Sequence, residues 1–230
     1  MLDFGYIEKN YTALLSDIER ISARVGVPLP KLVAVTKSAT DDELLALSRL
    51  GASDIGENRP QELKRKRELL LANGFSPRMH QIGTLQSNKV KIAAPISSLI
   101  HSLGSESLAL EISRRSEILG RAIPVLIEVN SGEEPQKDGV MPRDAERFLE
   151  YCMSLTGLEV KGLMTMGPAT ADGEELRPYY RNTKRLFDTL SWRYGFGDDP
   201  VLSMGMSDSY GVAIEEGSTL VRVGRRLFLK

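Results

Sequence analysis

The chain has 230 residues, with 30 Lys and Arg against 31 Asp and Glu, so its formal net charge at pH 7 is -1. This balance excludes a protein that holds nucleic acid mainly through a basic face. Hydrophobic residues make up 41% of the chain and charge is mixed, which excludes intrinsic disorder. The single cysteine, Cys152, excludes an internal disulfide, and two histidines leave little for a zinc site, so we expect no metal.

The sequence carries no targeting or membrane signal that we recognise. Residues 1–6 lack the basic and apolar regions of a signal peptide. The most apolar stretch, 123–129, is too short to span a bilayer and contains Glu128. We therefore expect a cytoplasmic protein with neither a membrane nor a nucleic-acid partner.

The first predicted element is an amphipathic helix. Apolar residues recur at spacings of three and four from Tyr11 to Val25, and Gly26 and Pro28 end the pattern. Residues 32–36 are rich in β-branched residues and predict a buried strand. Thr40 and Glu43 form the signature of a capping box, which starts the next helix.

Strand and helix patterns then alternate to the end of the chain. Strands are predicted at 53–56, 79–83, 98–102, 123–129, 158–164, 201–203 and 218–223, and helices at about 59–72, 87–93, 105–119, 142–155, 173–194 and 208–216. Such alternation indicates parallel strands joined by right-handed crossovers. We expect an α/β fold, a single (β/α)8 TIM-type barrel with an extra N-terminal helix, over residues 1–230. An open doubly wound sheet is the alternative.

In a barrel of this kind the functional site lies where the strands end. Lys37 directly follows the first strand, and an amine with a lowered pKa at that place could form a Schiff base with an aldehyde. An ordinary solvated lysine is the alternative. Ser203 and Ser207 follow the seventh strand and Gly224 the eighth, where barrels often bind phosphate, although N-caps and turns also use these residues.

Arg222 is a charged residue late in an otherwise apolar strand, so it needs a partner. It either points at a ligand or pairs with a carboxylate of a neighbouring strand, such as Glu57 or Glu128. A lysine, an arginine and a phosphate pocket together suggest pyridoxal 5'-phosphate.

Several longer motifs strengthen this interpretation. They are Ala34–Lys37, Gly56–Asn58 with Gln61–Glu62, His80–Lys89, Ile100–Ser102, Lys137 with Gly139, Gly162–Met164, Leu202–Ser209 and Ala213–Gly224. Through them the sequence resembles the pyridoxal phosphate homeostasis protein family, whose fold matches the N-terminal barrel of alanine racemase. The matching stretches run through nearly the whole chain, and the last two are long and specific.

The resemblance implies a role for individual residues. Lys37 would be the Schiff-base lysine, Ser203, Ser207 and Gly224 would hold the phosphate together with the residue after Gly224, and Arg222 would face the pyridine nitrogen. That following residue is Arg225 here, where family members usually have threonine or serine. The hydroxyl donor is therefore lost, while the backbone amide remains available.

Two further residues are candidates for cofactor binding. Asn58 could touch the cofactor or cap the helix that follows it. His80 could line the ligand cavity, although a strand histidine such as His80 or His101 is more often packed and hydrogen-bonded. We interpret Lys64–Arg67 as a solvated helix face. Met164, Met166, Met204 and Met206 gather at two strand ends, either as core or as packing around a flat ring.

The resemblance predicts a protein that binds pyridoxal 5'-phosphate and buffers or delivers it inside the cell. We assign no catalytic residue and expect a monomer, with pyridoxal-phosphate-dependent apoenzymes as acceptors. The alternative is a small amino-acid racemase that uses the same cofactor. Racemisation by two bases needs a second acid or base opposite the lysine, and we recognise none in a motif of this sequence.

Overall fold

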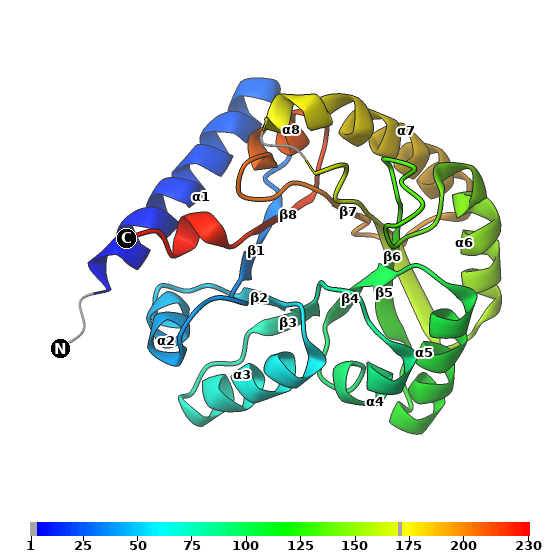
Figure 1. Ribbon diagram of the computed structural model, residues 1–230, viewed down its shortest axis with the longest axis horizontal. Helices are drawn as coiled ribbons and strands as arrows, with labels where there is room; N and C mark the ends of the chain where they lie inside the picture. Colours follow the sequence, from blue (N-terminus) through cyan, green and yellow to red (C-terminus); the bar gives the residue numbers. More distant parts are fainter. Residues whose placement is uncertain (1–3, 170–171) are drawn as a thin grey trace.

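Eight parallel strands close into a barrel in the computed structural model, which describes residues 4–169 and 172–230. Figure 1 looks nearly along the barrel axis and shows the strands as a ring with helices around the outside. In chain order the strands are β1 (Lys31–Val35), β2 (Asp54–Glu57), β3 (Arg78–Gln81), β4 (Leu99–Leu103), β5 (Ile123–Glu128), β6 (Leu158–Met164), β7 (Val201–Ser203) and β8 (Leu220–Val223). Because β1 also pairs with β8, the (β/α)8 prediction is confirmed and the open sheet is wrong.

The helices follow the predicted order, with differences at their ends. They are α1 (Gly5–Val25), α2 (Asp41–Arg49), α3 (Pro60–Ala72), α4 (Val90–Ala93), α5 (Glu106–Leu119), α6 (Ala145–Ser154), α7 (Arg177–Tyr194) and α8 (Tyr210–Glu215). Short 3-10 turns, η1 (Ser87–Lys89), η2 (Pro142–Asp144), η3 (Gly173–Leu176) and η4 (Arg225–Leu227), occupy ends that the patterns assigned to helices or loops. Thr40 and Glu43 form the predicted capping box, in which the Glu43 backbone N–H donates to Thr40 Oγ1.

The extra N-terminal helix packs against the last elements of the chain. In Figure 1 the C-terminus lies beside α1. The Asn10 amide donates to the carbonyl of Leu229 at 2.7 Å, and Tyr210 of α8 donates to Asp17 of α1. These contacts tie the ends of the barrel together where β1 meets β8.

Side chains alternate between the two faces of each strand, and the buried clusters show which face is which. Two large clusters combine strand and helix residues and therefore fill the layer between the sheet and the helices. A third, smaller cluster takes residues from strands alone: Val33, Leu99, Leu126, Met164, Val201 and Leu220. We assign this third cluster to the barrel interior. By the same alternation Arg222, two residues after Leu220, also faces inward.

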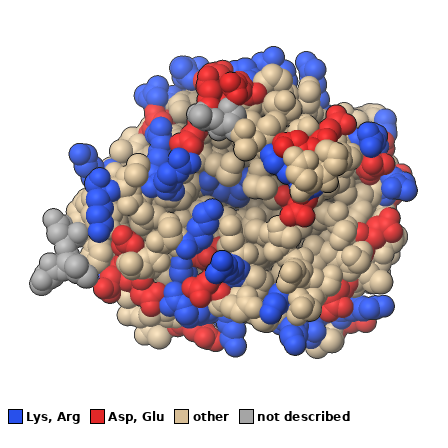
Figure 2. Space-filling model, viewed as in Figure 1, with Lys and Arg blue, Asp and Glu red and all other residues tan. Residues whose placement is uncertain are grey.

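The outer surface carries both signs of charge. Figure 2 shows Lys and Arg interspersed with Asp and Glu over the face seen in Figure 1. Within the described ranges, no helix combines the length and the apolar character that a membrane crossing requires.

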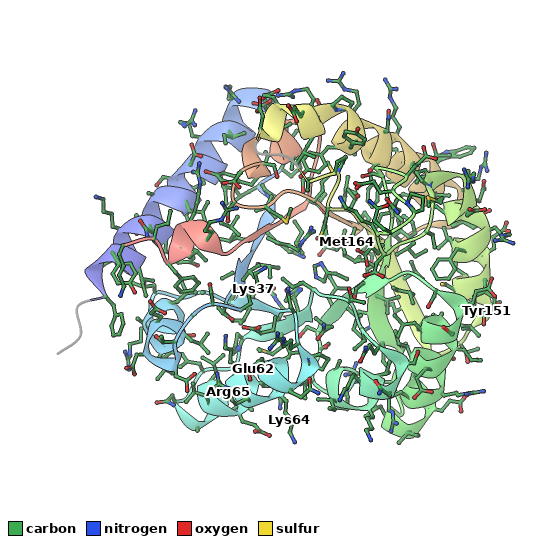
Figure 3. The ribbon with its side chains drawn as sticks, viewed as in Figure 1. Lys37, Glu62, Lys64, Arg65, Tyr151 and Met164 are labelled. Atoms are coloured by element: carbon green, nitrogen blue, oxygen red, sulfur yellow. The ribbon has the colours of Figure 1, made fainter. Side chains whose placement is uncertain are left out.

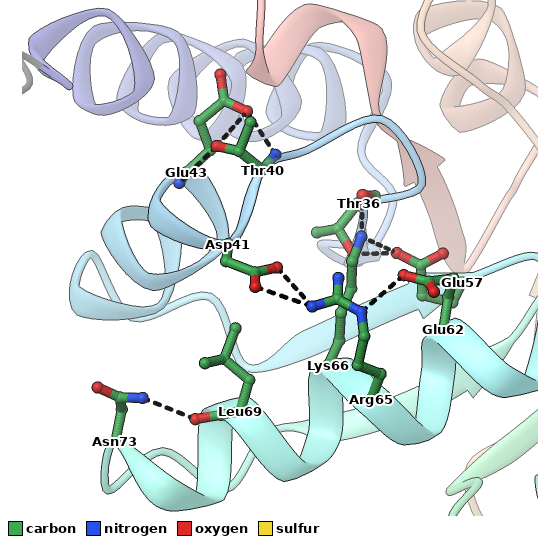
Figure 4. Close-up of polar contacts among 10 residues, drawn as sticks. All are labelled: Thr36, Thr40, Asp41, Glu43, Glu57, Glu62, Arg65, Lys66, Leu69 and Asn73. Carbon is green, nitrogen blue, oxygen red and sulfur yellow. Dashed lines mark hydrogen bonds and ion pairs between the residues drawn. The ribbon is translucent and has the colours of Figure 1, made fainter.

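Lys66 corrects our interpretation of the basic run as a solvated face. Its side chain is only 2% exposed, and its ammonium donates to Glu57 at 2.6 Å and to the carbonyl of Thr36 at 2.5 Å. The Thr36 hydroxyl also donates to Glu57, at 2.6 Å (Figure 4). Lys66 follows Arg65 directly in α3, and the rotation of about 100° between successive helical residues points Lys66 at the sheet, whereas Arg65 remains outside and pairs with Asp41 and Glu62.

We expect Lys66→Met to destabilise the fold strongly, because it leaves the Glu57 carboxylate buried without a cation. Breaking a buried pair in this way costs about 3–5 kcal/mol, so the midpoint of urea unfolding should fall. Lys64→Met, on the exposed side of the same helix, is the matched control and should leave the midpoint unchanged. An equal midpoint for the two variants would show that the buried pair does not stabilise the barrel.

Candidate functional site

A cavity of about 500 Å³ opens at the end of the barrel where the strands finish. Its lining includes six of the eight residues that the sequence analysis assigned to cofactor binding: Lys37, Asn58, Ser207, Arg222, Gly224 and Arg225. These residues come from the segments after β1, β2, β7 and β8 and from β8 itself. Parallel strands bring their carboxyl ends to one rim, so residues far apart in the sequence meet there.

Lys37 stands at this rim with its amine unengaged. Figure 3 shows it near the middle of the barrel mouth, whereas Lys64 and Arg65 lie on the outer side of α3. Among the described residues, no hydrogen bond or ion pair holds the Lys37 ammonium. Thr36, the residue before it, is fixed by Lys66 and Glu57 behind the strand. The backbone of Lys37 is thus anchored while its amine remains available to a ligand.

Arg222 lies at the base of the cavity and is 4% exposed. Its guanidinium donates to Ser203 Oγ at 2.5 Å and to the carbonyl of Thr165 at 3.1 Å. Burial lowers its pKa, which Tyr180 and Glu128 partly offset, and the group remains a cation. Among the described residues it forms no ion pair, so neither Glu57 nor Glu128 is the partner that we considered.

Unused donors gather at the side of the cavity formed by the loops after β7 and β8. Within the described part of the chain, the backbone N–H groups of Ser207, Asp208 and Arg225 have no hydrogen-bond acceptor. Gly224 precedes η4, and its Cβ position lies only 2.8 Å from the carbonyl oxygen of Val35, so a side chain would not fit. The Arg225 guanidinium donates to the Asp208 carboxylate at 2.6 Å, with both side chains exposed.

His80 and Ser203 differ from the expectation, because neither lines the cavity. Both are buried beneath its base, in a row of hydrogen-bonded groups that crosses the barrel interior. His80 Nδ1 lies 3.0 Å from His101 Nε2, and His101 Nδ1 lies 3.1 Å from Ser203 Oγ. The two histidines are therefore packed and hydrogen-bonded, the interpretation we favoured for strand histidines.

Asn58 lines the cavity and does not cap a helix. The N-cap of α3 is the next residue, Arg59, whose extended backbone leads into Pro60 at the first helical position. The methionines divide between two environments. Met164 and Met204 are buried core residues, whereas Met166 and Met206 line the cavity and are partly exposed.

Two acidic residues of the interior were not assigned a place in the site from sequence. Glu128, at the end of β5, lines the cavity and is 5% exposed; burial raises its pKa to about 7, with Asp138 adding to the shift. Asp54, at the start of β2, bonds His80 Nε2 at 2.9 Å. Both could have been found from the sequence as charged residues at inward positions of buried strands, but we used that criterion for Arg222 alone.

The donor set of the cavity fits a flat aldehyde that carries a phosphate. A free amine, unused backbone N–H groups with a serine hydroxyl, and a buried guanidinium are separate donors around one space. Arginine has five N–H donors, and within residues 4–169 and 172–230 only two hydrogen bonds occupy those of Arg222. The unused donors can meet an acceptor such as a ring nitrogen.

Comparison with known proteins identifies the family of this chain. The model of the alanine racemase N-terminal domain matches residues 10–229. The pyridoxal phosphate homeostasis protein of Aquifex aeolicus is 41% identical to this chain over 217 residues, which cover 94% of each of the two chains.

Solved structures resemble the whole barrel. A protein of unknown function from Bifidobacterium adolescentis superposes with a TM-score of 0.91 at 33% identity, covering 99% of this chain and 98% of its own. PipY of Synechococcus elongatus, in a structure with pyridoxal phosphate bound, superposes with a TM-score of 0.80 at 30% identity, covering 93% of this chain and 100% of its own. The chain therefore belongs to the alanine racemase N-terminal domain family and, within it, to the pyridoxal phosphate homeostasis protein family.

Proposed function

We propose that this protein binds pyridoxal 5'-phosphate and takes part in its homeostasis in the cytoplasm. The observation that carries the proposal is the shared cavity of Lys37 and Arg222, an unengaged amine and a buried guanidinium with unused donors. Relatives named for this role and the cofactor-bound PipY structure support it. Pyridoxal 5'-phosphate supplies an aldehyde that can condense with a lysine amine with loss of water.

Different residues of the chain bind different parts of pyridoxal 5'-phosphate. Lys37 supplies the amine, and Arg222 donates to the ring nitrogen. Because arginine only donates, it keeps that nitrogen unprotonated, which weakens the cofactor as an electron sink. Ser207, Gly224 and Arg225 bind the phosphate, and Asn58 contacts the ring from the β2 side.

The remaining parts of the proposal concern what happens to the bound cofactor. The cavity is open to solvent at the strand ends, so the cofactor can leave without unfolding of the barrel. We propose that residues 1–230 act as one domain and a monomer, with dependent apoenzymes as acceptors. We assign the chain to binding and delivery rather than turnover.

One observation favours the racemase alternative, namely the position and charge state of Glu128. It lines the same cavity as Lys37, and burial raises its carboxyl pKa to about 7. A group with such a pKa can accept and return a proton near neutral pH. Glu128 is thus the candidate for the second acid or base that racemisation requires.

We expect Lys37 to carry the covalent adduct. Protein mixed with pyridoxal 5'-phosphate should turn yellow, and borohydride followed by peptide mapping should place the adduct on Lys37. Lys37→Ala should lose both signals, whereas Lys64→Ala, on the outer side of α3, should retain them. An adduct on another lysine of the unmodified chain would contradict the assignment.

The Arg225 guanidinium should make phosphate binding sensitive to salt, because it is an exposed cation. At low ionic strength Arg225→Ala should bind pyridoxal 5'-phosphate about two- to five-fold more weakly, the range of an exposed ionic contact. At about 0.5 M salt the difference should vanish. Asp208→Asn, which frees Arg225, should tighten binding at low salt. Identical salt dependence in all three proteins would exclude a contact between Arg225 and the phosphate.

The two candidate functions differ in the exchange of an amino acid's α-hydrogen with deuterated water, measured on the loaded protein. Our proposal predicts no exchange beyond that of the free cofactor. A racemase should show exchange that increases as pH rises through about 7, where Glu128 loses its proton. That exchange should fall about 100-fold in Glu128→Gln, the scale of a lost acid–base group.

A further inference from the structure

Five polar residues cross the barrel interior as one continuous row of hydrogen bonds. Asp54, His80 and His101 come from the neighbouring strands β2, β3 and β4, and Ser203 and Arg222 come from β7 and β8. Successive contacts measure 2.9, 3.0, 3.1 and 2.5 Å. All five residues are at most 5% exposed, so their hydrogen bonds lie in the buried interior.

The two ends of this row have fixed and opposite hydrogen-bonding roles. Arg222 only donates. Asp54 only accepts when ionised, and its pKa lies well below the ordinary value. Burial pushes this pKa upward, but hydrogen bonds from His80, Arg78 and Ser53 outweigh that effect. A donor-only group at one end and an acceptor-only group at the other impose a direction on everything between them.

Each group between the ends then has one complete arrangement. His80 Nε2–H donates to Asp54, which leaves His80 Nδ1 to accept from His101 Nε2–H. His101 Nδ1 accepts from the Ser203 hydroxyl, and Ser203 Oγ accepts from Arg222. Both rings are neutral in this scheme, and burial with the nearby His80 and Arg222 indeed lowers the pKa of His101. The reverse direction would set two acceptors against each other at Asp54 and leave the Ser203 hydroxyl without an acceptor.

We propose that Asp54, His80, His101 and Ser203 are positioning residues, a directed chain of hydrogen bonds that holds the Arg222 guanidinium in its place at the base of the cofactor cavity. The inference rests on the proposed function for the identity of the ring that Arg222 meets. The donor-to-acceptor direction of these hydrogen bonds depends only on the protein's own residues and not on the cofactor. Ser203 thereby has a role other than phosphate binding, since its single hydrogen is committed to His101.

This row of hydrogen bonds also connects Arg222 to a distant counter-charge, the Asp54 carboxylate. Among the described residues no carboxylate pairs with Arg222 directly, and a buried cation without compensation is costly. The aligned donors between the two charges are polarised in the favourable sense. Asp54 lies outside the cofactor cavity and lines a separate hollow of about 220 Å³ beside α1. A substitution at Asp54 should therefore affect cofactor binding only through this row of hydrogen bonds.

The direction can be read from the two histidines of the cofactor-free protein. Because the chain has only His80 and His101, selective ¹⁵N labelling of histidine gives ring signals that two variants suffice to assign. We expect both rings at neutral pH to carry hydrogen on Nε2 and none on Nδ1. A ring protonated on Nδ1, or on both nitrogens, would overturn the proposed direction.

The positioning role is tested by binding two probes that form no covalent bond. Pyridoxine 5'-phosphate has the ring and the phosphate but an alcohol in place of the aldehyde, and inorganic phosphate has no ring. Ser203→Ala should weaken pyridoxine 5'-phosphate at least ten-fold, the scale of a hydrogen bond to a charged group, and leave inorganic phosphate unchanged. Asp54→Asn should mix the histidine tautomers, because an amide both donates and accepts. Asp54→Asn should also weaken the binding of pyridoxine 5'-phosphate and leave the binding of inorganic phosphate unchanged.

Arg78→Gln is the matched control for Asp54→Asn. Arg78 pairs with Asp54 at 2.6 Å but has a half-exposed side chain and stands outside the chain of donors. The Arg78→Gln variant should have a lower free energy of unfolding. Its histidine tautomers and its affinity for pyridoxine 5'-phosphate relative to inorganic phosphate should equal those of the parent protein. If Asp54→Asn changes the tautomers but not ring affinity, the positioning role is wrong. If the parent binds inorganic phosphate alone, the proposed function fails while the hydrogen-bond direction stands.

Discussion

Closure of the strands into a barrel is the constraint on which the rest of this structure depends. A closed sheet has one interior, and alternate residues of every strand must share it. Apolar residues fill part of that space, but Asp54, His80, His101 and Arg222 point there as well. Because buried polar groups need partners, they bond to one another across the barrel. Closure thus converts separate strand residues into one connected network.

The two faces of β1 and β2 support the site differently. Toward the helices, Lys66, Glu57 and Thr36 form a buried group that fixes the end of β1. Toward the interior, the next residue along, Lys37, enters an open cavity. A rigid backbone beneath a free amine is what a covalent binding site requires, since the lysine must reach its partner without loss of register.

The arrangement around Arg222 favours retention of a cofactor over its use. A guanidinium whose own bonds are fixed by Ser203 and the Thr165 carbonyl offers only donors to a ring. Glu128 lines the same cavity, and burial raises its pKa to about 7, with Arg222 acting against that rise. Arg222 and Glu128 are therefore the two side chains that decide whether a bound cofactor is only held or also acts on a substrate.

Strand and helix periodicity, together with motifs from Lys37 to Gly224, determined the barrel class, the rim that carries the site and the family. These features are local, so a sequence read in order contains them. Only the tertiary structure decided which polar residues meet. Lys66 turned inward because of its register on α3 against Glu57, and His80 and Ser203 fell below the cavity because strand closure set their depth along the barrel axis. His101 and Ser203 bond to each other although they are 102 residues apart in the chain, and spacing in the sequence holds no record of a contact made through a closed sheet.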